Sequence, residues 1–205
     1  MKVLVACEFS GIVRDAFAAK GHESWSCDLE PSETPGNHFI GDVLPVLEYG
    51  WDLLIAHPPC TFLSNAGVRH LHSTPSRNGV VAKINGEERW NELYKAADFF
   101  KRLINAPIDK ICVENPVPSR YSVEAIGRKY DQIIQPWQFG HGEIKRTCLW
   151  LKNLDELRPT KLVHGREARL HKMSPGPTRS RERSRTYPGI AAAMAEQWGR
   201  NEKDF

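Results

Sequence analysis

Short apolar runs alternate with amphipathic stretches through the first half of the chain. This alternation is typical of the strand and helix units that build a parallel sheet. Near-continuous apolar runs indicate central strands covered on both faces. We therefore expect buried strands at Lys2 to Cys7, Ser24 to Cys27 and Trp51 to Ala56, a shorter apolar run at Phe39 to Val43, and a helix from Ile12 to Lys20 closed by Gly21.

The second half continues the pattern with a longer helix. Residues Glu87 to Asn105 carry apolar side chains at three- and four-residue spacing, which indicates one buried helix face. Apolar runs predict strands at Lys110 to Val113 and Thr147 to Leu151, and a final helix is expected from Pro188 to Trp198. Together the elements predict one α/β domain over residues 1–205, with a mostly parallel central sheet and helices on both faces.

The composition is that of a folded globular protein, with 205 residues, 40% of them hydrophobic and 26% charged. Five scattered cysteines without metal-knuckle spacing predict reduced thiols and no metal site. The first apolar run is too short for a signal peptide, and no stretch is long enough to span a bilayer. These features predict a cytoplasmic protein without a membrane partner.

Positive charge is concentrated late in the chain, although the formal net charge is only +3. Between residues 164 and 187, seven lysines or arginines outnumber two acids. Such a segment suits phosphate contacts, because neutralising a phosphate backbone releases counterions; a solvated surface loop is the alternative. The part from Ser174 to Arg185, rich in Ser, Pro, Gly and Arg, is expected to be a loop. Its candidate phosphate ligands are Arg181, Arg183 and Arg185.

Chemistry-bearing residues follow the predicted strands, where open α/β sheets bind their ligands. Residues 8–11, Glu-Phe-Ser-Gly, follow the first strand, and their glycine would let the backbone approach a ligand while the next helix offers N–H groups to a carboxylate. Asp28 follows the second strand, where it would accept hydrogen bonds from ribose hydroxyls or cap a turn. Asp42 follows the third apolar run.

The fourth and fifth strands end in a thiol and a carboxyl group. Cys60 follows two prolines and is a candidate nucleophile, the alternative being a small buried apolar residue. Glu114 ends a buried strand, where desolvation would raise its pKa and keep it protonated for donation to a ring nitrogen. A structural cap of the next loop is the alternative for Glu114.

In this order, the segments from Lys2 to about Leu151 resemble the DNA cytosine carbon-5 methyltransferase family. Phe9-Ser10-Gly11 looks like the family's Phe-x-Gly cofactor turn, Pro59 to Gly67 resembles its Pro-Cys-Gln-x-Phe-Ser-x-Ala-Gly loop, and Glu114-Asn115-Pro116 its Glu-Asn-Val motif. The resemblance implies a Rossmann-like fold that uses S-adenosylmethionine. It implies cofactor contacts at Phe9, Ser10, Gly11, Asp28, Leu29, Asp42, Val43 and Pro58, and substrate contacts at Ser64, Asn115 and Arg146.

The resemblance also implies a mechanism. Cys60 would attack carbon 6 of cytosine, Glu114 would hold ring nitrogen 3, and carbon 5 would take the methyl group. Lys145 stands where the family has an arginine that contacts the base, and lysine lacks the planar guanidinium fork. For a cytosine inside a duplex, the base must first be flipped out of the stack.

The chain departs from the family in size. Only about 35 residues separate Lys152 from Tyr187, so the basic segment at 164–187 stands in place of a full target-recognition domain. We therefore expect a compact, phage-type DNA methyltransferase of the bacterial or infected-cell cytoplasm. Two alternatives stay open: the same chemistry on RNA or a free pyrimidine nucleotide, and a non-catalytic protein that binds the cofactor or a nucleic acid.

Overall fold

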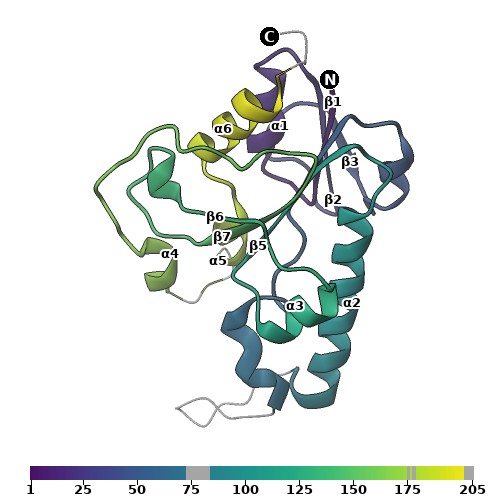
Figure 1. Cartoon of the computed structure of the whole chain (residues 1–205), viewed down its shortest axis with the longest axis vertical. Coiled ribbons are helices and arrows are strands. Elements are labelled where there is room, and N and C mark those ends of the chain that lie inside the picture. The colour runs from purple at the N-terminus through teal and green to yellow at the C-terminus, as the bar shows by residue number, and fades with distance from the viewer. Residues whose placement is uncertain (73–83, 175, 177–178, 201–205) are drawn as a thin grey trace.

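The computed structural model describes residues 1–72, 84–174, 176 and 179–200, and within them a seven-stranded sheet has the order β3-β2-β1-β4-β5-β7-β6 (Figure 1). Neighbouring strands from β3 to β5 pair in parallel, whereas β7 pairs antiparallel with both β5 and β6. The sheet is thus mostly parallel, as the sequence predicted. Its strands are β1 (Lys2–Ala6), β2 (Glu23–Asp28), β3 (His38–Ile40), β4 (Leu53–Ala56), β5 (Lys110–Pro116), β6 (Gln132–Ile134) and β7 (Thr147–Lys152).

Helices cover both faces of this sheet. One face packs against α1 (Ile12–Ala18) and α6 (Pro188–Trp198), which lie beside each other near the two chain ends in Figure 1, in purple and yellow. The other face packs against α2 (Gly86–Ile104), with η1 (Pro45–Glu48) and α3 (Arg120–Ile126) completing that core. The three layers confirm the Rossmann-like α/β fold.

The central strands are fully buried because both faces are covered. The side chains of Val3 to Ala6 and of Leu53 to Ala56 have no exposed surface. Chain order runs outward from β1 to β3 and then returns to β4 on the other side of β1. The boundary between β1 and β4 is therefore the switch point at which such sheets bind ligands.

The remaining elements are short. They are η2 (Asn65–His72), η3 (Pro136–Gln138), α4 (Arg169–Lys172) and α5 (Arg179–Ser184). In the part of the chain that the structure describes, no helix is both long enough and apolar enough to cross a bilayer.

Helix α5 lies where the sequence predicted a loop, from Ser174 to Arg185, and that prediction was wrong for its second half. Residues 175, 177 and 178 of the segment lie outside the described part. The helix is held by charge: Arg181 pairs with Glu30 and Glu33, and Arg185 pairs with Glu33. A sequence window of low hydrophobicity does not reveal partners about 150 residues away.

A buried arginine fixes the loop after β2 to helix α1. Arg14 is 1% exposed, and its guanidinium donates to the hydroxyl groups of Ser26, Ser32 and Thr34 and to the carbonyl of Pro35. A buried charge is tolerated only where such bonds replace its hydration. Gly11 lies directly beneath, at φ 73°, where a Cβ would collide with Thr34 Oγ1 and the Arg14 guanidinium.

Replacing Arg14 with Met should destabilise the fold, because the loop after β2 would lose the hydrogen bonds that anchor it to α1. We expect a loss of about 3 kcal/mol in the free energy of unfolding, measured by urea denaturation. Arg102→Met, on the exposed side of α2, is the matched control and should change it by less than about 0.5 kcal/mol. Equal effects of the two substitutions would contradict the role assigned to Arg14.

Candidate active site

Three parallel strands end side by side at the carboxyl edge of the sheet. The register pairs Ala6 with Ala56, and Ala56 with Val113. The residues that follow Ala6, Ala56 and Val113 therefore lie side by side at this edge of the sheet. Among them, His57 Nδ1 lies 3.0 Å from Glu114 Oε1 as an ion pair, with 8% and 13% of the two side chains exposed.

Cys60 begins a turn that is tightly bonded to its surroundings. Its carbonyl accepts from the backbone N–H groups of Leu63 (3.2 Å) and Ser64 (3.0 Å). Arg89 of α2 donates to the carbonyl of Thr61 (2.9 Å) and lies over the ring of Phe62, 5.1 Å from its centroid. Because Cys60 is half-buried at the start of this fixed turn, its thiol has a defined position.

The same turn is joined to the segment after β5. Ser122 Oγ (2.8 Å) and the Ser119 N–H (3.1 Å) donate to the carbonyl of Leu63, and the Asn65 N–H donates to the carbonyl of Val117 (2.9 Å). Ser64 forms an isolated bridge with Pro118. The chain segments that carry Cys60 and Glu114 are thus held as one unit.

Lys145 and Arg183 bring positive charge to the thiol. Burial raises the pKa of Cys60, and Glu114 adds to this rise, whereas the charges of Lys145 and Arg183 oppose it. The Lys145 ammonium donates to the carbonyl of Arg185 (3.1 Å). Burial lowers the pKa of Lys145, and Glu114 and Cys60 counteract that fall. Thiol, carboxylate and ammonium therefore share one electrostatic environment.

The expected protonated state of Glu114 is wrong. Burial does raise its pKa, as the sequence suggested, but the charges of His57 and Lys145 outweigh burial and hold the pKa below its usual value. Correspondingly, burial lowers the pKa of His57, while Glu114 and Glu8 more than restore it, so the net shift is upward. The directions of the two shifts favour a Glu114 carboxylate paired with an imidazolium.

The neighbours of these residues occupy different positions. Asn115 is buried; its amide nitrogen donates to the carbonyl of Pro116 (2.7 Å), and its Oδ1 has no hydrogen-bond partner among the described residues. Arg146 is exposed, and its charge acts on Cys148, in the core under α2, and not on Cys60. The structure therefore brings Lys145, but not Arg146, to the Cys60 thiol.

On the cofactor side, the turn after β1 differs from what the sequence suggested. The buried carboxylate of Glu8 accepts from the N–H groups of Val13 (2.7 Å) and Arg14 (3.2 Å) and from Ser10 Oγ (3.2 Å). The amino end of α1 is thus capped from within, and the expectation that it offers these groups to a ligand carboxylate is wrong. Phe9 is covered by the guanidinium of Arg181, 4.3 Å from the ring centroid.

Two carboxylates lie beyond β2 and β3. Asp28 Oδ1 accepts from the Glu30 N–H (3.0 Å), and Asp42 Oδ1 accepts from the Leu44 N–H (3.0 Å). Burial, with Asp28, Cys27 and Asp42 adding to it, raises the pKa of Cys7 to about 12, so both acids lie near this thiol. Their Oδ2 atoms have no hydrogen bond within the described residues.

The other cofactor residues expected from the sequence lie around this edge. Leu29 is 77% exposed, while Val43 and Pro58 are buried. No group of three metal-binding side chains gathers within the described residues.

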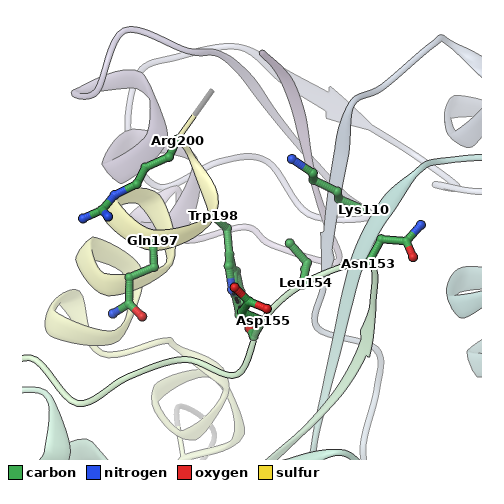
Figure 2. A pocket seen from close by; sticks show the side chains of 7 residues that line it. All are labelled: Lys110, Asn153, Leu154, Asp155, Gln197, Trp198 and Arg200. Carbon is green, nitrogen blue, oxygen red and sulfur yellow. Dashed lines mark hydrogen bonds between the residues drawn. The ribbon is translucent and has the colours of Figure 1, made fainter. Parts of the chain in front are cut away.

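Of two hollows that the described residues line, one adjoins the start of α1 and the other does not. The larger, about 340 Å³, is shown in Figure 2 and is lined by Lys110, the first residue of β5, so it lies at the opposite edge of the sheet from Glu114. Some polar groups in its wall are paired: Trp198 Nε1 donates to the carbonyl of Asp155 (3.0 Å), and the Asn153 amide donates to Asp109 Oδ1 (3.0 Å). The second hollow, about 230 Å³, lies beside Ile12 at the start of α1 and is lined by Ile12, Arg169, Leu170, Glu182, Arg185, Thr186, Tyr187 and Pro188.

The chain matches no protein-family model and no curated relative. Among solved structures it is similar to one described as a candidate DNA modification methyltransferase encoded within a prophage of E. coli, with 13% sequence identity and a TM-score of 0.47. The alignment covers 80% of this chain and 52% of that one, so this chain spans about half the length of that protein. A likeness this distant assigns neither a reaction nor a substrate.

Sequence reasoning missed three residues of the site. His57, Arg89 and the capping role of Glu8 emerge only from the structure. His57 stands directly before Pro58-Pro59-Cys60, and that position was the available signal. For Arg89 the sequence carried no signal, because an arginine on an amphipathic helix usually lies on the solvent-exposed face.

The reactivity of Cys60 should depend on Lys145. Removing this charge in Lys145→Met should raise the pKa of Cys60 further, so that alkylation by iodoacetamide reaches its plateau at higher pH than in the parent. Mass spectrometry of the Cys60 peptide across a pH series measures this. Arg146→Met, which removes the adjacent exposed charge, should leave the profile in place; a shift as large as that of Lys145→Met would contradict the arrangement.

Proposed function

We propose that the chain methylates carbon 5 of cytosine in DNA, with S-adenosylmethionine as methyl donor and Cys60 as nucleophile. The observation that carries the proposal is the meeting, at the carboxyl edge of the sheet, of the bonded turn that begins at Cys60, the His57–Glu114 ion pair and the Lys145 ammonium on the Arg185 carbonyl. A pure binding protein would gain nothing from a thiol fixed beside two opposite charges. Covalent attack on a pyrimidine ring needs both the nucleophile and groups that stabilise charge in the ring.

The residues beyond β2 and β3 fit the nucleoside part of the donor. Asp28 and Asp42 each keep one carboxylate oxygen free of hydrogen bonds among the described residues, and both lie near Cys7. Such acceptors suit ribose hydroxyls and an adenine amine, and their negative charge suits a cationic sulfonium. Since Glu8 caps α1, the amino-acid part would extend into the hollow beside Ile12.

The chain's own groups perform the remaining steps. The Cys60 thiolate, favoured by Lys145, forms a bond to carbon 6, and the ring electrons move toward nitrogen 3, where Glu114 holds the ring. The bound donor supplies an electrophilic methyl group for carbon 5. Loss of the carbon 5 proton and departure of the Cys60 thiolate restore the aromatic ring as 5-methylcytosine.

One observation favours a second candidate substrate. Arg181 and Arg185 are neutralised by Glu30 and Glu33, which leaves fewer free cations for a long phosphate backbone. A free cytidine nucleotide carries its own phosphate and needs fewer of them. The chemistry at Cys60 would be unchanged.

Methyl transfer can be measured with labelled S-adenosylmethionine and duplex DNA, RNA or deoxycytidine monophosphate, followed by nucleoside analysis. We expect labelled 5-methylcytosine in DNA, and a loss of at least about 10³-fold in rate for Cys60→Ala, because the covalent route is removed. Cys148→Ala, in the core under α2, should retain activity. Absence of product on all three substrates would overturn the proposal, and product on the nucleotide alone would select the second candidate.

The basic segment can be tested one arginine at a time. Arg183 forms no ion pair or hydrogen bond within the described residues, and its charge reaches Cys60, whereas Arg181 is already paired. Arg183→Ala should therefore weaken DNA binding and reduce the slope of log affinity against log salt by about 1. Arg181→Ala, the matched control, should change that slope less. The reverse order in a fluorescence-anisotropy titration would contradict this assignment.

A further inference from the structure

His57 is a buried histidine whose hydrogen-bonding groups are not satisfied by the fold. Its Nδ1 lies 3.0 Å from Glu114 Oε1 as an ion pair, and its buried Nε2 has no partner among the described residues. A histidine that only filled space would have both ring nitrogens satisfied, since a buried unpaired polar atom costs about 1–3 kcal/mol. Its position therefore suggests a role in the chemistry at Glu114.

The charges around His57 come from three elements. Glu114 lies near the carboxyl end of β5, Glu8 lies in the turn after β1, and Lys145 precedes β7. The two carboxylates favour the imidazolium, and the ammonium opposes it. Because the carboxylates outweigh burial and Lys145, the pKa of His57 is raised while that of Glu114 is lowered, which favours a proton of the pair on the imidazole.

We propose that His57 is a positioning residue that stores the proton which Glu114 delivers to ring nitrogen 3 of cytosine. This inference rests on the proposed function, in which ring nitrogen 3 gains electron density when Cys60 attacks. Glu114 is a carboxylate and carries no proton of its own, so the proton for nitrogen 3 comes from His57.

The step balances in protons and electrons. The Cys60 thiolate forms the sulfur–carbon 6 bond, and the carbon 5–carbon 6 π electrons shift into the ring. His57 Nδ1 first passes its proton to the Glu114 carboxylate, and the resulting carboxyl group then gives that proton to nitrogen 3. His57 becomes neutral and Glu114 returns to a carboxylate. After methylation, a solvent water takes the carbon 5 proton as the Cys60 thiolate leaves carbon 6. The nitrogen 3 proton then returns through Glu114 to His57.

His57→Gln tests the proposal, because glutamine holds no proton for Glu114. We expect kcat to fall about 10²-fold with KM nearly unchanged, as for loss of one proton-transfer group. The alkaline limb of the rate profile should move to lower pH, because a carboxyl beside Lys145 releases its proton at lower pH than the paired imidazolium does. His22→Gln, a half-buried histidine that directly precedes β2 at the opposite edge of the sheet, is the matched control and should leave both unchanged.

A measurement without substrate keeps this inference separate from the proposed function. Carbon-13 NMR of the histidines measures the pKa of His57, which should fall in Glu114→Gln. Burial and Lys145 both lower this pKa, and the variant removes the carboxylate of Glu114 that raises it. The spectra also report whether each variant is folded. An unchanged His57 titration in folded Glu114→Gln, or an unchanged pH–rate profile in active His57→Gln, would overturn the inference. Absence of methylation by the parent would instead remove the proposed function, and the catalytic role of His57 with it.

Discussion

The parallel register of β4 with its neighbours β1 and β5 is the constraint on which the site depends. Side chains alternate between the two faces of a strand, so residues two apart point to the same face. Ile55 and Cys112 face the α1–α6 layer, and His57 and Glu114 follow them by two residues. A slip of one residue would move one of the pair to the α2 face and separate the charges. The ion pair is therefore a consequence of sheet register.

Antiparallel β7 adds the second cation to this pair. Pro116 pairs with Thr147, so Lys145, two residues earlier in the chain, arrives beside the carboxyl end of β5. A lone carboxylate at this depth would be protonated, because burial raises its pKa. The positive charges of His57 and Lys145 lower the pKa of Glu114 and keep its carboxylate ionised. Lys145 also opposes the rise in the pKa of Cys60. One charge thus sets the state of both an acid and a thiol.

The sequence predicted the central strands because apolar runs end at prolines and polar residues, but it did not predict β6 or α3. Pro58-Pro59 stops β4, which is why Cys60 could be placed at a strand end from its neighbours alone. The same reasoning predicted that Glu114 lies at that edge of the sheet. Lys145 was predicted as a site residue only from the family resemblance. Sequence reasoning failed wherever a residue's state depends on a distant partner. The pKa of Glu114 depends on His57, the amino end of α1 on Glu8, and α5 on two acids far away in the sequence.

Helix α5 and the residue after it, Arg185, connect the basic segment to the turn after β1 and to Lys145. Arg181 covers Phe9 in the turn after β1, Arg185 pairs with Glu33, and the Arg185 carbonyl accepts from the Lys145 ammonium. These ion pairs are largely exposed, so salt screens them. Raising the ionic strength would then weaken two things at once: the attraction of Arg183 for phosphate and the contacts that hold α5 over Phe9. The basic segment is therefore a structural part of the site. Two of its arginines, Arg181 and Arg185, form ion pairs within the protein and are less available to bind a ligand phosphate.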